Sequence, residues 1–560
     1  MHRCLHIAEI LHEICQHISA SDLDTNGMPA VPSCHATATL AALARTCKTI
    51  QSPALDALWG DLDYFMRLVQ CLPRDLWKVH EVPPTAPHLT QPESPIVFQR
   101  AMDMSDWDIF NKYAPRVRSL GGLAYDNNPY KVTTTVSSEV LQVLSCPPTS
   151  SPLLPNLRAI TWNGLPVDHI PLFRHFLTTK VTRLIIRLDS ETLDAYSYST
   201  LSLVGIICPK LRNFAIGRAK HAPRETGRSI TIVSRTLCRL QHLKSVMVNI
   251  INGEAIIHLA RLPALASASF ALDISFNAAS ISSQLPATPF PRLSLLKMQA
   301  PVLSSMDSLL KTMKISPHLV DVSFDGDTPA ARVAAFFVTL CSSCSPDSLF
   351  QLVIQENTRT LHDDIQNPST CLLKIDQLRP LFQFTRLRSL RLELFSTFSI
   401  NDAGIEELAR AWPALTALHL NKAAGWEAPS QITFQGLAAL LQHCPKLSTL
   451  SIDVDFRSLE ALPVPRACPC NGLSNEHIKE VSLGNSRLDK PVVVAVFVSA
   501  VLPNLMKVNA WATRWADRRL EGVRQNYKAK WDNFNQLLPV IAATRAQGKG
   551  CSHAPRPSVR

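Results

Sequence analysis

The residues best suited to metal chemistry lie together at the N-terminus of the chain. Cysteine and histidine, the preferred protein ligands of zinc, occur there at Cys4, His6, His12, Cys15 and His17. Their spacing matches neither a zinc finger nor a zinc knuckle. The same stretch carries apolar residues at helical spacing, which indicates a packed amphipathic helix. The sequence therefore predicts no metal site and no bound cofactor.

Two further cysteine pairs have spacings that invite a chemical interpretation. Cys341 and Cys344 form a C-x-x-C motif, but this motif ends an apolar helical stretch and has no thioredoxin-like context. Cys468 and Cys470 fall in a loop between two repeats, where free thiols are expected. The chain has no glycine-rich phosphate-binding loop and no G-x-S-x-G nucleophile motif. We therefore expect a protein that is not an enzyme.

Composition and charge indicate a protein of the cytoplasm or nucleus. The formal net charge is +11, but residues 511–560 alone hold ten Lys and Arg against three acids, so most of the excess lies in one tail. The longest apolar run, Val492–Leu502, has about half the length of a membrane span. The N-terminal stretch is too polar for a secretory signal. Fifteen cysteines are scattered through apolar segments, as reduced cysteines are. We expect no membrane association.

A short apolar phrase, LxxLxL, recurs along most of the chain. Proline stands two positions before eight of its thirteen first residues, which we call anchors, where the proline content predicts about one. Proline cannot continue a helix and biases the residue before it to extended geometry, so it marks a joint between helix and strand. The anchors are 22 to 38 residues apart, enough for one strand and one helix. They are Leu157, Val181, Leu211, Leu243, Leu265, Leu293, Leu319, Leu349, Leu387, Leu415, Leu447, Ile478 and Leu505.

The intervals between anchors carry helical periodicity. Leu437, Leu440 and Leu441 share one helical face, for example, and Asn401 is a typical N-cap. Strands and helices that alternate at this period predict an α/β fold, an irregular and curved leucine-rich-repeat solenoid whose strands line the concave side. We place this array at residues 113–510, and the phrase around Val117 is a candidate first repeat.

Side chains two, four and six residues after each anchor are predicted to face the concave side, because strand side chains alternate between two faces. Charges of both signs occupy these positions in equal number, whereas nucleic acid requires a basic stripe. The mixture predicts binding of a protein, a substrate that the sequence does not identify, and no nucleic acid. A solvated face that binds nothing strongly is the alternative. The predicted partner-binding residues are Arg183, Arg187, Lys297, Asp321, Arg391, Glu393, His419 and Asp453.

Two amphipathic segments, residues 5–23 and 39–62, precede the repeats. Their apolar residues recur at helical spacing, which predicts a small helical bundle within residues 1–62 that leaves one apolar face uncovered. These segments resemble the F-box family. The matching elements are IAEIL at 7–11, Ile14, Asp-Leu at 22–23, Cys-Lys at 47–48 and Leu-Trp at 58–59.

Together with the C-P-x-L-x-x-L-x-L phrases at Cys208 and Cys444, the pattern is similar to fungal families of F-box-like leucine-rich-repeat proteins. The resemblance implies docking to the Skp-type adaptor of a cullin-RING (SCF-type) ubiquitin ligase, with the repeats holding a protein substrate near the charged ubiquitin carrier. Such a receptor acts by raising effective concentration and needs no catalytic residue of its own. The implied adaptor-binding residues are Ile7, Ile10, Leu11, Ile14, Leu55, Leu58 and Trp59.

Two alternatives to a ligase receptor remain open. The helical bundle could serve only to cap the first repeat, which leaves a leucine-rich scaffold without ubiquitin-ligase coupling. The array could instead activate a GTPase, although no specific residue suggests it, and a GTP hydrolysis assay without acceleration would exclude that reading.

Two segments flank the predicted array. Residues 63–112 are predicted to form a helix and a linker marked by five prolines between Pro83 and Pro95. Residues 511–560 are predicted to form a capping helix and a basic tail. The alternative for this tail is a basic amphipathic helix that binds a membrane surface or nucleic acid.

Overall fold

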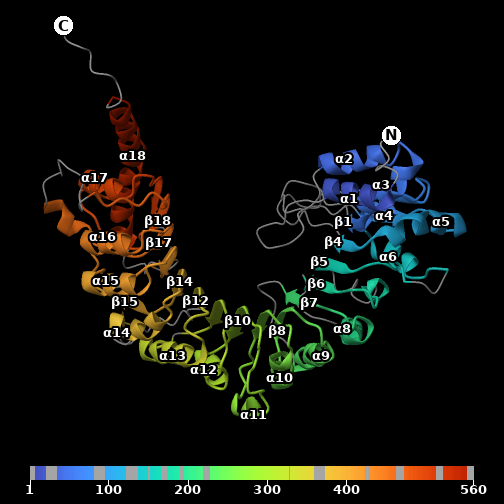
Figure 1. Ribbon diagram of the computed structural model, residues 1–560, viewed down its shortest axis with the longest axis horizontal. Coiled ribbons are helices and arrows are strands. Elements are labelled where there is room, and N and C mark those ends of the chain that lie inside the picture. The colour runs from blue at the N-terminus through green and yellow to red at the C-terminus, as the bar shows by residue number, and fades with distance from the viewer. Residues whose placement is uncertain are drawn as a thin grey trace, which may run out of the picture. The chain divides into compact units, whose positions relative to one another are not determined.

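The computed structural model shows a fold built from repeated pairs of strand and helix. It divides into two compact units, Met1–Leu265 and Ala266–Arg560. Within each unit, parallel strands stack side by side and helices cover one face of them (Figure 1). The predicted strand-helix repeat architecture is therefore confirmed within each unit. The structure describes residues 7–19, 34–80, 95–121, 136–148, 152–165, 173–188, 195–218, 227–326, 328–357, 372–422, 425–426, 429–461, 472–511 and 521–551.

Unit 1 contains parallel strands that pair in the order β1-β4-β5-β6-β7-β8. A separate antiparallel pair joins β2 and β3. The helices include three at the N-terminus, α1, α2 and α3, which pack on one another. The strands are β1 (Asp61–Leu62), β2 (Trp77–Val79), β3 (Ile96–Phe98), β4 (Ser119–Gly121), β5 (Ala159–Leu165), β6 (Arg183–Leu188), β7 (Asn213–Arg218) and β8 (Ser245–Ile250). The helices are α1 (Ala8–Ser19), α2 (Cys34–Leu43), α3 (Lys48–Gly60), α4 (Met66–Val69), α5 (Met104–Tyr113), η2 (Ala114–Arg116), α6 (Ser138–Leu144), η4 (Arg174–Phe176), α8 (Ala195–Ile207), α9 (Gly227–Cys238) and α10 (Gly253–Arg261).

Unit 2 continues the same plan, with parallel strands in the order β9-β10-β11-β12-β14-β16-β17-β18-β19. A short parallel pair, β13 and β15, lies apart from them. The strands are β9 (Ser267–Ala271), β10 (Leu295–Ala300), β11 (Leu319–Phe324), β12 (Gln351–Glu356), β13 (Leu372–Lys374), β14 (Ser389–Glu393), β15 (Thr397–Ser399), β16 (Ala417–Leu420), β17 (Thr449–Ser451), β18 (Glu480–Ser482) and β19 (Lys507–Asn509). The helices are α11 (Ala279–Ser282), α12 (Leu303–Lys311), α13 (Ala330–Ser343), α14 (Ile375–Leu378), η6 (Arg379–Gln383), α15 (Asp402–Ala411), α16 (Phe434–His443), η7 (Arg457–Ala461), α17 (Pro491–Val501) and α18 (Glu521–Cys551).

The anchors of the LxxLxL phrase form the buried spine of both units. All of them except Leu319 are buried, and so is Val117 in the phrase that leads into β4. Strand register explains the exception, because Leu295 of β10 pairs with Leu319, which aligns the buried Leu293 with Pro317. The anchor of this repeat is therefore Pro317 and not Leu319, which is half-buried at the start of β11. Proline fills the position because the anchor precedes the hydrogen-bonded strand.

Proline separates helix from strand in the manner that the sequence predicts. Helix α16 ends at His443, Pro445 follows, and β17 begins at Thr449. Asn401 caps α15 through its side-chain oxygen, which accepts a hydrogen bond from the Gly404 amide at 2.9 Å. The joint and the cap are local features of the chain, which is why the sequence is sufficient to locate them.

Helix α18 covers the last strand of unit 2. The side-chain amide of Asn535 bonds both backbone groups of Val508, accepting from its N–H at 2.8 Å and donating to its carbonyl at 2.9 Å. Asn535 thus takes the place that another strand would occupy beside β19. Trp531 is buried beneath the helix and donates its indole N–H to the Ser486 carbonyl at 3.0 Å.

Replacing Asn535 with alanine is expected to lower the free energy of unfolding by about 2 kcal/mol, because two backbone groups of the edge strand lose their partner. Urea unfolding followed by tryptophan fluorescence would measure the loss. Asn526→Ala is the matched control, since Asn526 lies exposed on the same helix. Equal losses in the two variants would contradict a role for Asn535 at the sheet edge.

Candidate functional site

The N-terminal bundle leaves an apolar stripe on the outside of α1. Ile7 immediately precedes α1, and Ile10 and Ile14 lie within it. They are 46%, 36% and 38% exposed, and their spacing of three and four residues places them on one side of the helix. The opposite side of α1 packs into the bundle through Cys15, which is fully buried. We call Ile7, Ile10 and Ile14 the α1 stripe.

The other residues implied as adaptor contacts have different surroundings. Leu11 is only 2% exposed and belongs to the interior, so it supports the helix and cannot contact a partner directly. Leu55 and Leu58 are half-buried against the bundle core. Trp59 is half-buried as well, and its ring centroid lies 4.8 Å from that of Tyr113. The α1 stripe is the freely accessible part of this set.

The bundle is joined to the first repeats without an intervening linker. Helix α3 ends at Gly60, and β1 begins at Asp61 and pairs with β4. Arg116, which precedes β4, forms an ion pair with Asp56 of α3 and donates to the Ser52 carbonyl at 3.3 Å. The module and the start of the sheet therefore share one element. Four of the five linker prolines, all but Pro95, lie outside the described residues.

Strand register places four of the predicted partner-binding residues in one row across unit 2. Lys297 pairs with Asp321, Val353 lies between Asp321 and Arg391, and Arg391 pairs with His419. The Lys297 ammonium lies 2.7 Å from the Asp321 carboxylate. We call this set the strand-face row. It presents paired charges of both signs and a histidine on the face of the sheet opposite the helices.

The two predicted partner-binding residues of unit 1 lie on a single strand. Arg183 and Arg187 both belong to β6, where they share one face because they are four residues apart. Arg183 is half-buried and Arg187 is exposed.

Two of the predicted partner-binding residues are buried, and the prediction is wrong for them. Asp453 is 2% exposed, and one carboxylate oxygen accepts the backbone N–H of Trp426 at 3.0 Å and of Asn485 at 2.9 Å. Glu393 is 7% exposed, and its carboxylate lies 3.3 Å from Arg391. Both residues are six positions past their anchors, where the strand ends and side chains no longer alternate between two faces. Burial without a cationic partner raises the pKa of Asp453 to about 7.

His419 is a neutral hydrogen-bonding group at physiological pH. Burial lowers its pKa to about 4, and the nearby positive charges of Lys422 and Arg391 act in the same direction. Its Nδ1 lies 2.8 Å from the Ser451 hydroxyl on the adjacent strand. His419 therefore contributes polarity to the strand-face row and no charge.

Buried polar side chains link neighbouring repeats behind the strand ends, a feature that the sequence did not predict. The Glu356 carboxylate accepts the backbone N–H groups of Thr328 and Phe395 at 2.8 and 2.9 Å. The Asn421 side chain accepts from Leu394 at 2.8 Å and donates to the Ser396 carbonyl at 2.9 Å. Asp453 belongs to the same series. These side chains form hydrogen bonds with backbone groups of the loops that follow the strands, so their role is structural.

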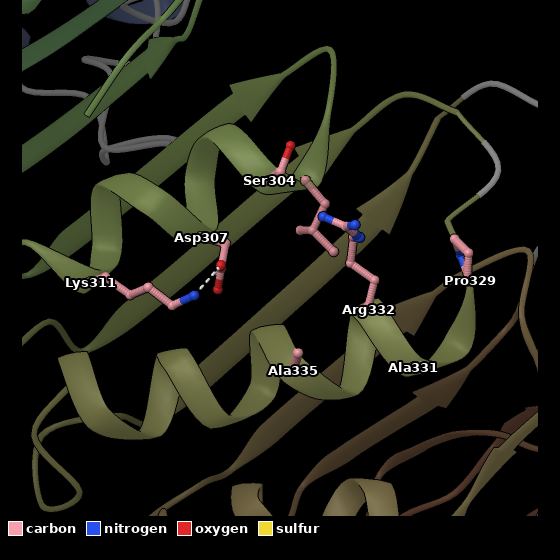
Figure 2. A pocket seen from close by; sticks show the side chains of 8 residues that line it. Ser304, Asp307, Lys311, Pro329, Ala331, Arg332 and Ala335 are labelled. Carbon is pink, nitrogen blue, oxygen red and sulfur yellow. Dashed lines mark hydrogen bonds and ion pairs between the residues drawn. The ribbon is translucent and has the colours of Figure 1, made fainter. Parts of the chain in front are cut away.

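A shallow groove lies between α12 and α13 on the helical side of unit 2 (Figure 2). Its volume is about 520 Å³. Asp307 lies on one wall, paired with Lys311 at 2.6 Å, and Arg332 lies on the other. Asp307 also accepts a hydrogen bond from Thr339. The Asp307 carboxylate is therefore already engaged by two partners, and Arg332 is the charged side chain on the opposite wall.

Where the structure describes the cysteine motifs, their thiols are hydrogen-bonded or buried, as structural cysteines are. The Cys341 thiol donates to the Pro380 carbonyl at 2.9 Å, and burial raises the pKa of Cys344 to about 12. Within the described ranges, no three His, Cys, Asp or Glu side chains gather as metal ligands. Cys4, His6, Cys468 and Cys470 lie outside those ranges. No helix in the described part of the chain is both long and apolar enough to span a membrane.

Comparison with known proteins leaves the family open. No protein-family model matches the chain, and no curated protein matches it. One similar solved structure is described as "Crystal structure of TLR13-ssRNA13 complex", with 14% sequence identity and a TM-score of 0.25. The similarity covers 73% of this chain and 60% of that chain, so this chain spans less than two thirds of the length of that relative.

Proposed function

We propose that this chain is a protein-binding leucine-rich-repeat scaffold that serves as the substrate receptor of an SCF-type ubiquitin ligase. The observation that carries the proposal is the α1 stripe. Single exposed isoleucines are common on protein surfaces, but three on one helical face form a patch that favours burial by a partner. Covering one isoleucine side chain contributes about 1.5 to 3 kcal/mol.

The position of the bundle within unit 1 supports this reading. Because α3 runs directly into β1 and Arg116 ties β4 back to Asp56, a partner docked on α1 is held at a constant distance from the first repeats. Transfer of ubiquitin by proximity requires such a restricted geometry, since effective concentration falls when the connection lengthens or loosens. The chain itself then needs no catalytic residue.

The strand-face row supports a protein substrate. It offers an ion pair, a second cation at Arg391 and a neutral imidazole at His419. Charges of both signs on one surface select partners by complementarity and disfavour mismatched ones.

The direct test is co-purification with the Skp-type adaptor of the host. Ile10→Asp combined with Ile14→Asp is expected to weaken adaptor binding at least 100-fold, because two apolar contacts are lost and two charges are buried. The matched control is Ile274→Asp with Val338→Asp, which changes two apolar residues that are 61% and 55% exposed elsewhere. This control should bind as the parent does.

Absence of adaptor binding by the folded parent protein would contradict the receptor assignment and leave a scaffold without ligase coupling. Circular dichroism should show equal helix content for the parent and both double variants. Leu11 is unsuitable as a probe, since its burial means that a charge there would disrupt the bundle.

A further inference from the structure

The N-terminal edge of the strands in unit 1 carries a row of cations. In these repeats, the residue that follows each anchor donates its backbone N–H to the backbone carbonyl of the equivalent residue in the preceding repeat. The bonds run from Arg158 to Arg118 at 2.7 Å, from Thr182 to Arg158 at 2.8 Å, from Arg212 to Thr182 at 2.7 Å and from Lys244 to Arg212 at 2.7 Å. Five consecutive repeats therefore place four basic side chains in one row over about 19 Å, with Thr182 between Arg158 and Arg212.

A second row of basic residues lies two positions earlier in the same repeats. It contains Lys180, Lys210 and His242, all exposed. Arg118, Arg158, Arg212 and Lys244 in the first row are exposed as well. We call these two rows the basic edge. The segments that form it are 115–119, 155–159, 179–183, 209–213 and 241–245, and they contain no acidic residue.

Three cations of the basic edge are available to a ligand. Arg158, Arg212 and Lys244 form no ion pair with any residue that the structure describes. Asp61 on β1 is the acid near the end of the row, beside Arg118, and burial raises its pKa. Cations that lie side by side repel one another, and an anionic partner would relieve that repulsion.

The equivalent edge of unit 2 is different. Asp347, Glu476 and Glu480 stand in or beside its edge segments. Arg386 and Arg388 there lie over the Phe350 ring, at 4.8 and 5.3 Å from its centroid. Acidic residues thus interrupt the edge of unit 2 and not the five edge segments of unit 1.

We propose that the basic edge binds an extended acidic segment of a polypeptide, rich in Asp or Glu, and that this segment belongs to the substrate. The proposal rests on the receptor function argued above and names a recognition element for its substrate. The two rows are two residues apart along the chain, about 7 Å, which suits one extended chain. Arginine guanidinium groups bind carboxylates through paired hydrogen bonds.

The residue types of the edge favour a polypeptide over single-stranded nucleic acid. Proteins that bind single strands combine basic residues with aromatic side chains on which the bases stack. The five edge segments contain no Phe, Tyr or Trp. This surface is not apparent from the positions two, four and six after each anchor, because its basic residues stand one residue after or one residue before the anchor.

The test uses the full chain and a fluorescein-labelled peptide of about ten residues, long enough to span the row, in which glutamate alternates with serine. Fluorescence anisotropy at low ionic strength measures its binding. Arg158→Glu, Arg212→Glu and Lys244→Glu combined are expected to weaken binding about 30-fold, and added salt should reduce the affinity of the parent protein.

The matched control is Arg292→Glu, Lys446→Glu and Lys479→Glu, three exposed cations at the corresponding edge of unit 2, the first two one residue before their anchors and the third one residue after. It should bind the peptide within about twofold of the parent. Equal loss in both triple variants would overturn the assignment to the basic edge, as would no peptide binding by the parent. A labelled single-stranded RNA of equal length that binds more tightly than the peptide would overturn the ligand class.

These outcomes are separate from those of the adaptor experiment. Peptide binding at the basic edge without adaptor binding would refute the receptor function while locating the edge as a docking surface. Adaptor binding without peptide binding would refute this inference alone.

Discussion

Replacing Gly484 with alanine is expected to lower the free energy of unfolding by about 4 kcal/mol. Gly484 has a φ of +42°, a conformation that side chains disfavour, and an added Cβ would lie 1.8 Å from Oδ1 of Asp453. The carboxylate cannot retreat easily, because the Trp426 and Asn485 amides hold it. Overpacking of a buried site typically costs 1 to 3 kcal/mol and backbone strain adds about 1 kcal/mol. Urea unfolding monitored by circular dichroism would measure the loss.

Gly326→Ala separates the two contributions to this loss. Gly326 also has a positive φ, +99°, but nothing lies within 4 Å of an added Cβ. It is expected to show the backbone cost alone, about 1 kcal/mol. Equal losses of stability in the two alanine variants would mean that the contact between an added Cβ at position 484 and Asp453 has no measurable cost.

The stability of unit 2 is expected to fall as the pH rises from 4 to 7, because of Asp453. Its folded-state pKa, about 7, lies above its ordinary value of 3.8. Between these values the folded chain binds more protons than the unfolded chain, so the contribution is complete below pH 4 and is lost through pH 7. Asp453→Asn removes this titration. At pH 8 the variant should be about 2 to 4 kcal/mol more stable than the parent, and near pH 4 the two should be similar.

The measurement is the midpoint of thermal unfolding of both proteins across this pH range, and the informative quantity is their difference at each pH. Subtraction removes the titration of other groups. Asp321→Asn serves as the control, because Asp321 is half-buried beside Lys297. A difference between parent and Asp453→Asn that does not vary with pH would contradict the raised pKa.

The repeat architecture could be predicted from the sequence because its signals are local. An anchor such as Leu157 or Leu447 is buried together with the apolar residues three and five positions after it, which share one face of the strand that follows. Pro445 follows α16 and prevents the helix from continuing, because its ring fixes φ and it has no backbone N–H. Leu319 was misassigned because proline also fits an anchor position, and only pairing with β10 reveals the correct alignment.

The surroundings of the site residues depended on contacts between repeats. Leu11 and the α1 stripe fall in one amphipathic segment, and packing against α3 determines which side is covered. Asp453 lies two residues past the end of β17 and accepts backbone N–H groups from Trp426 and Asn485, whereas Glu393 is the last residue of β14; both are buried.

The sequence by itself determined the strand-helix period, the joints and the apolar spine, since each depends on residues a few positions apart. Only the tertiary structure decided that Asp453 is buried against the Asn485 amide, that the strand-face row lines up across β10, β11, β14 and β16, and that Arg158, Arg212 and Lys244 share one edge. The physical reason is strand register. It brings together residues that lie some thirty positions apart, and it follows from the combined packing of all the repeats in a unit.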